Sequence, residues 1–235
     1  MKKEITKQER EVFKMTDQEI LKHIDHTQLK QFATWEDIEK LCDEAVKYQT
    51  ASVCIPPAYI KRVHDKYAEN INICTVVGFP LGYSVTSAKV AEIEQALVDG
   101  CNEIDMVVNI SDVKNGAYDK VEEEIKTLKA ACGKHILKVI IETCFLTEEE
   151  KIAMCKAVTN AGADYIKTST GFGTGGATIE DIRLFKQHIG SNVKMKAAGG
   201  VKTKADLIMF LEEGCDRIGT SSAVGMLQGN EAKGY

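Results

Sequence analysis

Short runs rich in β-branched residues recur along this chain, and nearly every run is followed by a turn and a segment of helical periodicity. Successive runs start about 20 to 33 residues apart, which fits one strand, one helix and two short loops per unit. The eight runs span residues 24–26, 51–55, 71–77, 103–108, 136–141, 165–169, 194–198 and 217–220. Eight β/α units in 235 residues predict a (β/α)8 TIM barrel of the α/β class rather than an open sheet.

Helix signals lie between the predicted strands. Thr34 and Thr203 are followed three residues later by an aspartate, as expected at a helix start. A further N-terminal helix begins after Thr16, with Glu19 at its third position, and we expect it to close the bottom of the barrel. The chain has no linker or low-complexity tract, so it is predicted to be one domain over 1–235, with an N-terminal extension (1–16) and a C-terminal tail (229–235).

The charge balance excludes some partners. A net charge of -5 is a poor match for nucleic acid or anionic membranes, because both bind clustered lysine and arginine. The N-terminus has no apolar core of a signal peptide, and no run of 18 apolar residues occurs, so we expect the protein to stay in the cytoplasm. Eight scattered cysteines without a C-x-x-C pair indicate reduced thiols rather than a disulfide framework.

Several predicted strands contain charged residues that an apolar core would not accommodate. An isolated one is explained by an outward position or a strand tip in water, whereas a group on facing strands favours a site, because an unpaired charge in a dry interior is costly. Chemistry in a (β/α)8 barrel gathers at the carboxyl ends of the strands. The charged strand residues are Asp25, Asp105, Lys138, Lys167, Lys194 and Lys196.

Three of these residues make a catalytic group if they point inward together: Lys167, Lys196 and Asp105. An ordinary lysine with a pKa near 10.4 is about 0.04% free amine at pH 7. A second ammonium group about 4 Å away adds about 4 kcal/mol of repulsion at an effective dielectric of 20, which lowers that pKa to about 7 to 8. A free amine can attack a carbonyl and form an imine, and a carboxylate can move the protons. The pattern predicts Schiff-base aldolase chemistry.

A glycine pattern, G-x-G-x-x-G, follows Lys167 at Gly171, Gly173 and Gly176. A dinucleotide loop with this spacing needs an acidic residue at the end of the next strand, where this chain offers Lys194 and Lys196. The nucleotide interpretation is therefore disfavoured.

Two further loops favour a phosphate site. Gly199 and Gly200 end the seventh predicted strand, and Ser221 and Ser222 open the last helix. Loops after strands 7 and 8 form the usual phosphate site of this fold, so a phosphorylated substrate is expected, although turn glycines alone would explain either loop. A metal site is not expected, because among the histidines only His23 and His26 lie near each other in sequence.

The motifs together resemble the 2-deoxyribose-5-phosphate aldolase family. The resemblance runs from about residue 17 to the last helix. It rests on IDHTQLK (24–30), SVCIPP (52–57), VVGFPLG (76–82), EIDMVVN (103–109), LKVIIET (137–143), YIKTSTGF (165–172), MKAAGGVKT (195–203) and RIGTSS (217–222).

The resemblance implies a class I aldolase, a carbon-carbon lyase of deoxyribonucleotide catabolism. Such an enzyme reversibly cleaves 2-deoxy-D-ribose 5-phosphate to D-glyceraldehyde 3-phosphate and acetaldehyde without a cofactor. Its expected partners are these small molecules, with a homodimer as the candidate assembly. The alternatives are another Schiff-base or transaldolase-like enzyme acting on a different sugar phosphate, and a barrel that binds sugar phosphates without catalysis.

The resemblance also implies roles for individual residues. Lys167 is similar to the Schiff-base lysine, Asp105 to the proton-transfer group and Lys196 to the second lysine that lowers its neighbour's pKa. Asp25 and Thr27 are similar to residues that bind the substrate hydroxyl. The remaining substrate-binding candidates are Cys54, for which a core position is an equal reading, Lys138, Thr168, Gly171, Gly199, Gly200, Ser221 and Ser222.

Two positions need separate mention. Some relatives carry a lysine after the glycine of the sixth loop, where this chain has Phe172, so backbone donors and Lys202 are left to bind the phosphate. Some relatives end in a tyrosine that assists proton transfer, and Tyr235 ends this chain.

Overall fold

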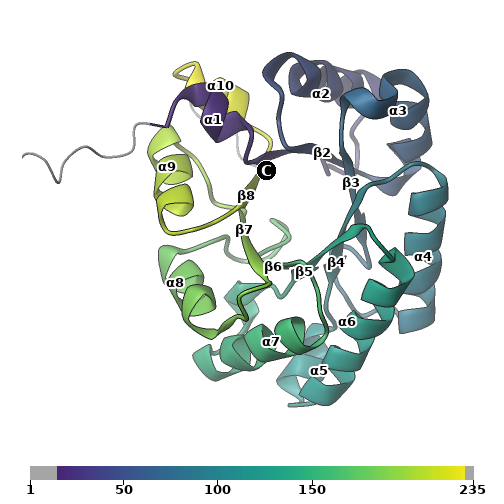
Figure 1. Cartoon of the computed structure of the whole chain (residues 1–235), viewed down its shortest axis with the longest axis vertical. Coiled ribbons are helices and arrows are strands. Elements are labelled where there is room, and N and C mark those ends of the chain that lie inside the picture. Colours follow the sequence, from purple (N-terminus) through teal and green to yellow (C-terminus); the bar gives the residue numbers. More distant parts are fainter. Residues whose placement is uncertain (1–14, 231–235) are drawn as a thin grey trace, which may run out of the picture.

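The computed structural model describes residues 15–230, in which eight parallel strands close into a barrel (Figure 1). Each strand pairs with the next along the chain, and β8 pairs with β1. The TIM-barrel prediction is confirmed. The strands are β1 (Ile24–Thr27), β2 (Ser52–Ile55), β3 (Ile73–Val77), β4 (Glu103–Val107), β5 (Ile136–Ile140), β6 (Tyr165–Lys167), β7 (Lys194–Ala198) and β8 (Arg217–Thr220).

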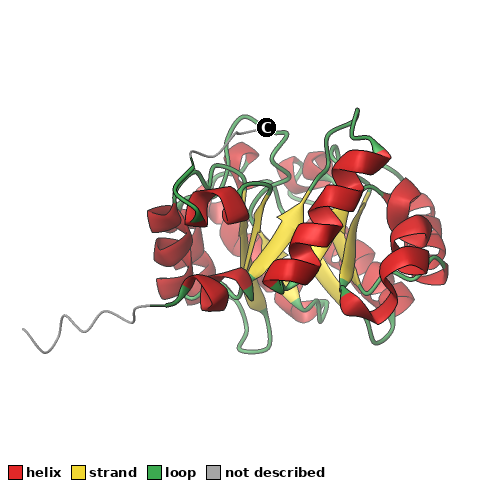
Figure 2. Ribbon diagram, turned by 90° about the horizontal axis from the view of Figure 1, so that it is seen from above, coloured by secondary structure: helices red, strands yellow, loops and turns green. Residues whose placement is uncertain are grey.

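Helices surround the strand barrel on its outside (Figure 2). They are α1 (Asp17–Leu21), α2 (Trp35–Tyr48), α3 (Ile60–Tyr67), α4 (Thr86–Val98), α5 (Ile110–Lys114), α6 (Tyr118–Cys132), α7 (Glu148–Asn160), α8 (Ile179–His188), α9 (Lys204–Glu212) and α10 (Ala223–Leu227). Short 3-10 turns are η1 (Pro57–Tyr59), η2 (Ala68–Asn70) and η3 (Thr143–Phe145). Within residues 15–230, no helix combines the length and apolar character needed to cross a bilayer.

The predicted helix starts at Thr16, Thr34 and Thr203 are confirmed as capping boxes. In each, the threonine side chain accepts a hydrogen bond from the backbone of the third helical residue, whose carboxylate accepts one from the cap. The predicted place of α1 is wrong. This five-residue helix lies against α10 outside the strand ring rather than across the bottom of the barrel (Figure 1).

Alternation along the strands separates two environments. In β4, Ile104 and Met106 belong to the apolar layer between strands and helices, whereas Glu103 and Asp105 contact charged groups inside the barrel. Burying an isoleucine or methionine contributes roughly 1.5 to 3 kcal/mol, so the outer layer supplies most of the stabilisation. The strands can therefore carry charges on their inner face.

Candidate active site

The three predicted catalytic side chains meet on one oxygen atom. Lys167 on β6 and Lys196 on β7 are direct partners in the strand register, and Asp105 projects from β4. The Lys167 Nζ lies 2.8 Å from Asp105 Oδ2, and the Lys196 Nζ lies 2.7 Å from the same oxygen. The two amines are thus within the range of about 4 to 6 Å over which one charge changes its neighbour's ionisation.

A wider ion network extends below this group. Lys138 Nζ lies 2.6 Å from Glu103, 3.0 Å from Asp105 and 3.5 Å from Asp25. Arg217, at the start of β8, lies 2.5 Å from Asp25 and 3.1 Å from Glu103. Asp25 also contacts Lys196 and accepts a hydrogen bond from Ser52. Through its charged side chains the network links six of the eight strands, β1 and β4 to β8.

Glu103 and Arg217 were missed by the sequence analysis. The signal for Glu103 was present, because it lies two residues before Asp105 and therefore on the same face of β4. Arg217 gave a weaker signal, since a charge at the first residue of a strand is usually solvated. Lys194 does not belong to this network. It is exposed at the start of its strand and lies 3.4 Å from Asp216, as expected for a strand-tip charge in water.

The ionisation of Asp105 reflects two opposing effects. Burial raises the pKa of its carboxyl, but Lys138, Lys167 and Lys196 outweigh burial and hold the pKa well below its usual range. The same balance lowers the pKa of Asp25, where burial is opposed by Lys138, Lys196 and Arg217. Both side chains are therefore carboxylates at neutral pH.

Lys196 is a permanent cation. Burial alone would lower its pKa, but Asp105 and Asp25 have the larger effect, so the pKa of Lys196 lies above the usual lysine value. Lys167 differs in its surroundings, because among the described residues Asp105 is its one carboxylate partner at salt-bridge distance. Lys167 is the amine of the network with the fewest acidic partners.

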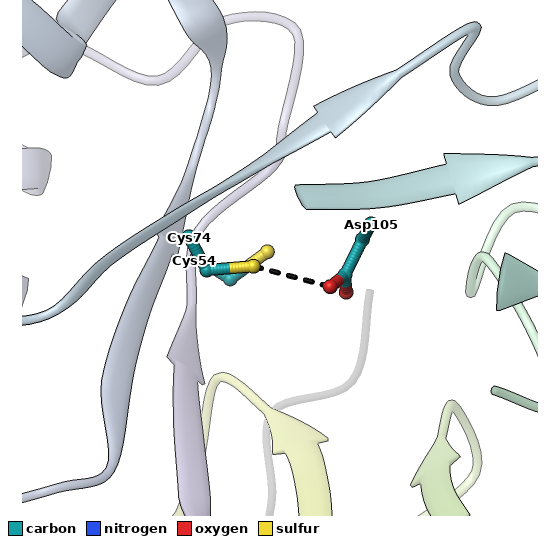
Figure 3. A group of neighbouring side chains, drawn as sticks. All are labelled: Cys54, Cys74 and Asp105. Carbon is teal, nitrogen blue, oxygen red and sulfur yellow. Dashed lines mark hydrogen bonds between the residues drawn. The ribbon is translucent and has the colours of Figure 1, made fainter. Parts of the chain in front are cut away.

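Cys54 and Cys74 are register partners on β2 and β3 and lie beside Asp105 (Figure 3). Their sulfurs and an Asp105 oxygen are within 4.8 Å of one another, and the Cys74 thiol donates to Asp105 across 3.2 Å. A hydrogen bond from Cys74 lowers the pKa of Cys54. The set is a poor metal site, because three lysine side chains already contact the Asp105 carboxylate.

Two predicted substrate-binding threonines are engaged by the protein backbone. Thr27 donates its hydroxyl to the Asp25 carbonyl oxygen across 2.7 Å. Thr168 donates to the Ala198 carbonyl and accepts from the Ala198 amide, which ties β6 to β7. Both side chains are buried at the carboxyl ends of their strands, and their contact with substrate stays a prediction.

The predicted phosphate residues line one pocket of about 220 Å³ at the carboxyl ends of β6, β7 and β8. Gly219 joins this pocket to the ion network, because a Cβ there would lie 3.3 Å from Lys196 Cε. The lining residues are Gly171, Gly173, Thr174, Gly175, Gly176, Gly199, Gly200, Val201, Lys202, Gly219, Thr220, Ser221 and Ser222.

Each glycine of the G-x-G-x-x-G pattern has its own structural reason. Gly171 adopts a φ of 88°, a conformation that favours glycine. A Cβ on Gly173 would lie 2.9 Å from the Cys144 sulfur. A Cβ on Gly176 would lie 2.4 Å from the carbonyl carbon of Gly199. The spacing thus reflects close packing of two loops.

Phe172 and the tail complete the predicted positions. Phe172 packs edge-on against Phe79 with ring centroids 5.3 Å apart, and it is 40% exposed. Lys202 lines the pocket, and its contact with phosphate stays a prediction. Tyr235 lies outside the described residues. All eight cysteines are free thiols, and every one except Cys144 is buried.

Comparison with known proteins gives a consistent result. Residues 14–232 match the sequence profile described as DeoC/LacD family aldolase. A deoxyribose-phosphate aldolase of Clostridium botulinum (strain Alaska E43 / Type E3) is 72% identical over 94% of this chain and 100% of its own length. One of Clostridioides difficile (strain 630) is 57% identical over 92% of this chain and 99% of its own.

The solved structures agree. A tetrameric deoxyribose phosphate aldolase from Aeropyrum pernix superposes with a TM-score of 0.82 at 29% identity, covering 91% of each chain. The resemblance drawn from the motifs is therefore confirmed at the level of the family, and the barrel with its buried lysines is that of an aldolase. The chain belongs to the DeoC/LacD aldolase family.

Proposed function

We propose that the protein reversibly cleaves 2-deoxy-D-ribose 5-phosphate to D-glyceraldehyde 3-phosphate and acetaldehyde through a Schiff base on Lys167. The observation that carries this proposal is the pair of lysines that share one oxygen of Asp105. The curated relatives named deoxyribose-phosphate aldolase support the choice of substrate.

Charge explains why Lys167 is the nucleophile. The network contains four basic side chains and three carboxylates, so it carries one positive charge in excess when all are ionised. An excess charge in a buried site is costly and favours release of one proton. We assign the nucleophile to Lys167, because it has one carboxylate partner in the network, whereas Lys138 has three and Lys196 has two.

The first step joins the amine to the open-chain sugar. The Lys167 nitrogen attacks the aldehyde carbon C1 and forms a carbinolamine. Asp105, which contacts both amines, moves the proton that leaves nitrogen to the carbinolamine oxygen, and a second proton from solvent lets this oxygen depart as water. The product is a protonated imine, which acts as an electron sink.

The second step breaks the carbon-carbon bond. A base removes the proton of the C3 hydroxyl, the C2–C3 bond breaks, and its electron pair neutralises the imine as an enamine. Glyceraldehyde 3-phosphate leaves with the new C3 carbonyl. Protonation of the enamine at C2 and addition of water then release acetaldehyde and the Lys167 amine. No cofactor is needed, because the protonated imine accepts the electrons.

The glycine-lined pocket binds the phosphate in this proposal. Backbone amides after β6, β7 and β8 suit an anion, and Lys202 adds a positive charge. Phe172 replaces the lysine of some relatives, so the phosphate depends on these remaining donors. Gly219 places the pocket next to Lys196, and the sugar would span from the pocket to Lys167.

Trapping of the imine tests the proposal. Wild-type protein incubated with acetaldehyde and borohydride should gain a reduced two-carbon adduct on Lys167, identified by peptide mass spectrometry. Lys167→Leu should lose both the adduct and the cleavage of 2-deoxyribose 5-phosphate. The matched control, Lys194→Leu, removes an exposed lysine two residues before Lys196 and should keep both.

The outcomes separate the alternatives. Absence of an acetaldehyde adduct in the wild type contradicts the proposal outright. An adduct on Lys167 without cleavage of 2-deoxyribose 5-phosphate indicates a Schiff-base aldolase for another sugar phosphate.

A further inference from the structure

Glu142 is a buried acid with an unusual backbone, and the proposed chemistry does not use it. It lies two residues after the end of β5 and adopts a φ of 53°, in the left-handed region that residues other than glycine and asparagine rarely occupy. Its side chain is 3% exposed, and burial raises the pKa of its carboxyl. Strained backbone at a buried acid points to a function for the side chain.

The Glu142 carboxylate holds a single residue of the loop after β6. Thr170 donates its backbone N–H to Oε1 across 3.1 Å and its hydroxyl to Oε2 across 2.5 Å. The Thr170 hydroxyl oxygen in turn accepts the Phe172 amide across 3.0 Å. The two contacts fix the backbone of Thr170 between Lys167 and Gly171.

The chain after β5 also follows the chain after β6. Ile141 donates to the Lys167 carbonyl across 3.1 Å, and Thr143 donates to the Thr168 carbonyl across 2.9 Å. Glu142 lies between these two donors, and its left-handed backbone accompanies a side chain that reaches over to Thr170. The carboxylate therefore extends the strand pairing into the glycine-rich loop, where regular pairing has ended.

Close packing shows that the loop is shaped around this carboxylate. A Cβ on Gly173 would lie 3.2 Å from the Glu142 Cδ, closer than most side chains tolerate. Gly171 and Gly173 both line the phosphate pocket. Thr170, the residue that Glu142 holds, is thus one residue from Gly171 and three residues from Gly173.

We propose that Glu142 is a positioning residue for the substrate phosphate, holding Thr170 so that the backbone donors of the loop after β6 face the pocket. The inference rests on the proposed function, because it assigns the phosphate of the substrate to that pocket. Glu142 touches neither the reacting carbons nor the phosphate in this arrangement, and it acts through the loop.

Kinetics with and without the phosphate group test the inference. Glu142→Ala should raise the KM for 2-deoxyribose 5-phosphate and the inhibition constant of inorganic phosphate about tenfold, the usual cost of losing hydrogen bonds to a charged group. The kcat/KM for unphosphorylated 2-deoxyribose, and the trapping of acetaldehyde on Lys167, should keep their wild-type values. Glu149→Gln, an exposed glutamate seven residues later, is the matched control.

Glu142→Gln is a second, more conservative variant that keeps the test valid if Glu142→Ala does not fold. The amide keeps an acceptor for the Thr170 N–H but offers the hydroxyl an NH2 group in place of an acceptor, so the phosphate inhibition constant should rise by less than in Glu142→Ala. An unchanged constant in both variants overturns the inference. Equal losses for phosphorylated and unphosphorylated sugars also overturn it, because they indicate a general structural role. Failure of trapping in the wild type contradicts the proposed function instead.

Discussion

The proposed chemistry depends on the charge of Lys196, although Lys196 itself does not react. It contacts both Asp25 and Asp105, which raise its pKa, and it is buried. Its charge therefore persists across the pH range in which an enzyme of this kind is assayed. With Lys196 present the network has one more basic group than it has carboxylates.

Replacing Lys196 by leucine should shift activity toward alkaline pH. The variant network has three basic groups and three carboxylates, so the excess positive charge on which the proposed chemistry depends is lost. We expect a loss of cleavage rate of at least about tenfold at pH 7, partly recovered as pH rises toward about 10.4, where an ordinary lysine becomes a free amine. The measurement is kcat/KM against pH.

The control for this change is Lys194→Leu, which removes an exposed lysine from the same strand and should keep the wild-type pH profile. Circular dichroism at each pH shows whether the Lys196 variant is folded. A pH response equal to that of the wild type would show that Lys196 does not act through charge.

The sequence predicted the grouping of the three central side chains better than it predicted their surroundings. Lys167, Lys196 and Asp105 stood out because each interrupts an apolar strand, and the structure brings them together. Glu142 could not have been found in this way. Its side chain reaches the loop from a left-handed backbone position, and neither composition nor spacing shows which residue adopts that conformation.

At the scale of elements, the loops after β6 and β7 act as a pair. Backbone packs on backbone where Gly176 meets Gly199, and the Ala177 amide donates to the Ala198 and Gly199 carbonyls across 3.1 Å. The strand limits were predicted to within two residues because β-branched runs end at glycine or polar turns. The place of α1 was not, because its position depends on contact with α10 rather than on local sequence.

A methyl group at Gly176 should separate these two loops. Gly176→Ala places its Cβ 2.4 Å from the Gly199 carbonyl carbon, and neither partner has a flexible side chain that can move. We expect the KM for 2-deoxyribose 5-phosphate to rise about tenfold or more, with about 1 to 3 kcal/mol lost from the free energy of unfolding.

Gly225→Ala in α10 is the matched control, because a Cβ there meets its nearest neighbour at an ordinary 3.8 Å. It should preserve KM and slightly stabilise the helix. A wild-type KM in Gly176→Ala would mean that the loops tolerate separation.

At the scale of the whole molecule, the barrel joins an apolar outer layer to a charged interior. Acid acts on the charged interior, because its carboxylates bind protons and the apolar side chains of the outer layer do not. The homodimer expected from the sequence stays a prediction, and the tetramer named for the Aeropyrum pernix relative belongs to that protein.

Acid should unfold the protein through its buried carboxylates. The pKa values of Asp25 and Asp105 are lowered in the folded state, whereas an unfolded aspartate titrates near 3.9. Their stabilisation is therefore fully present above about pH 5 and falls as pH drops below about 4, by about 1.4 kcal/mol per pH unit for each group. Urea unfolding between pH 6 and pH 2.5 measures this decline.

Asp105→Asn provides the comparison. It should lower stability at pH 6, because Lys167 and Lys196 lose a carboxylate partner, and should also give a shallower decline with acid. An equally steep decline in this variant would assign the acid response to other carboxylates.

The closed ion network also constrains how this barrel can evolve. Asp25, Glu103, Lys138 and Lys196 each contact at least two opposite charges, so a single substitution leaves several partners uncompensated at once. Substitutions at these four positions are therefore expected to occur together or not at all. Exposed loop positions above them, other than the packed glycines after β6 and β7, can vary one residue at a time. Diversity in substrate preference is therefore expected to accumulate at the rim of the barrel while its interior is inherited as a block.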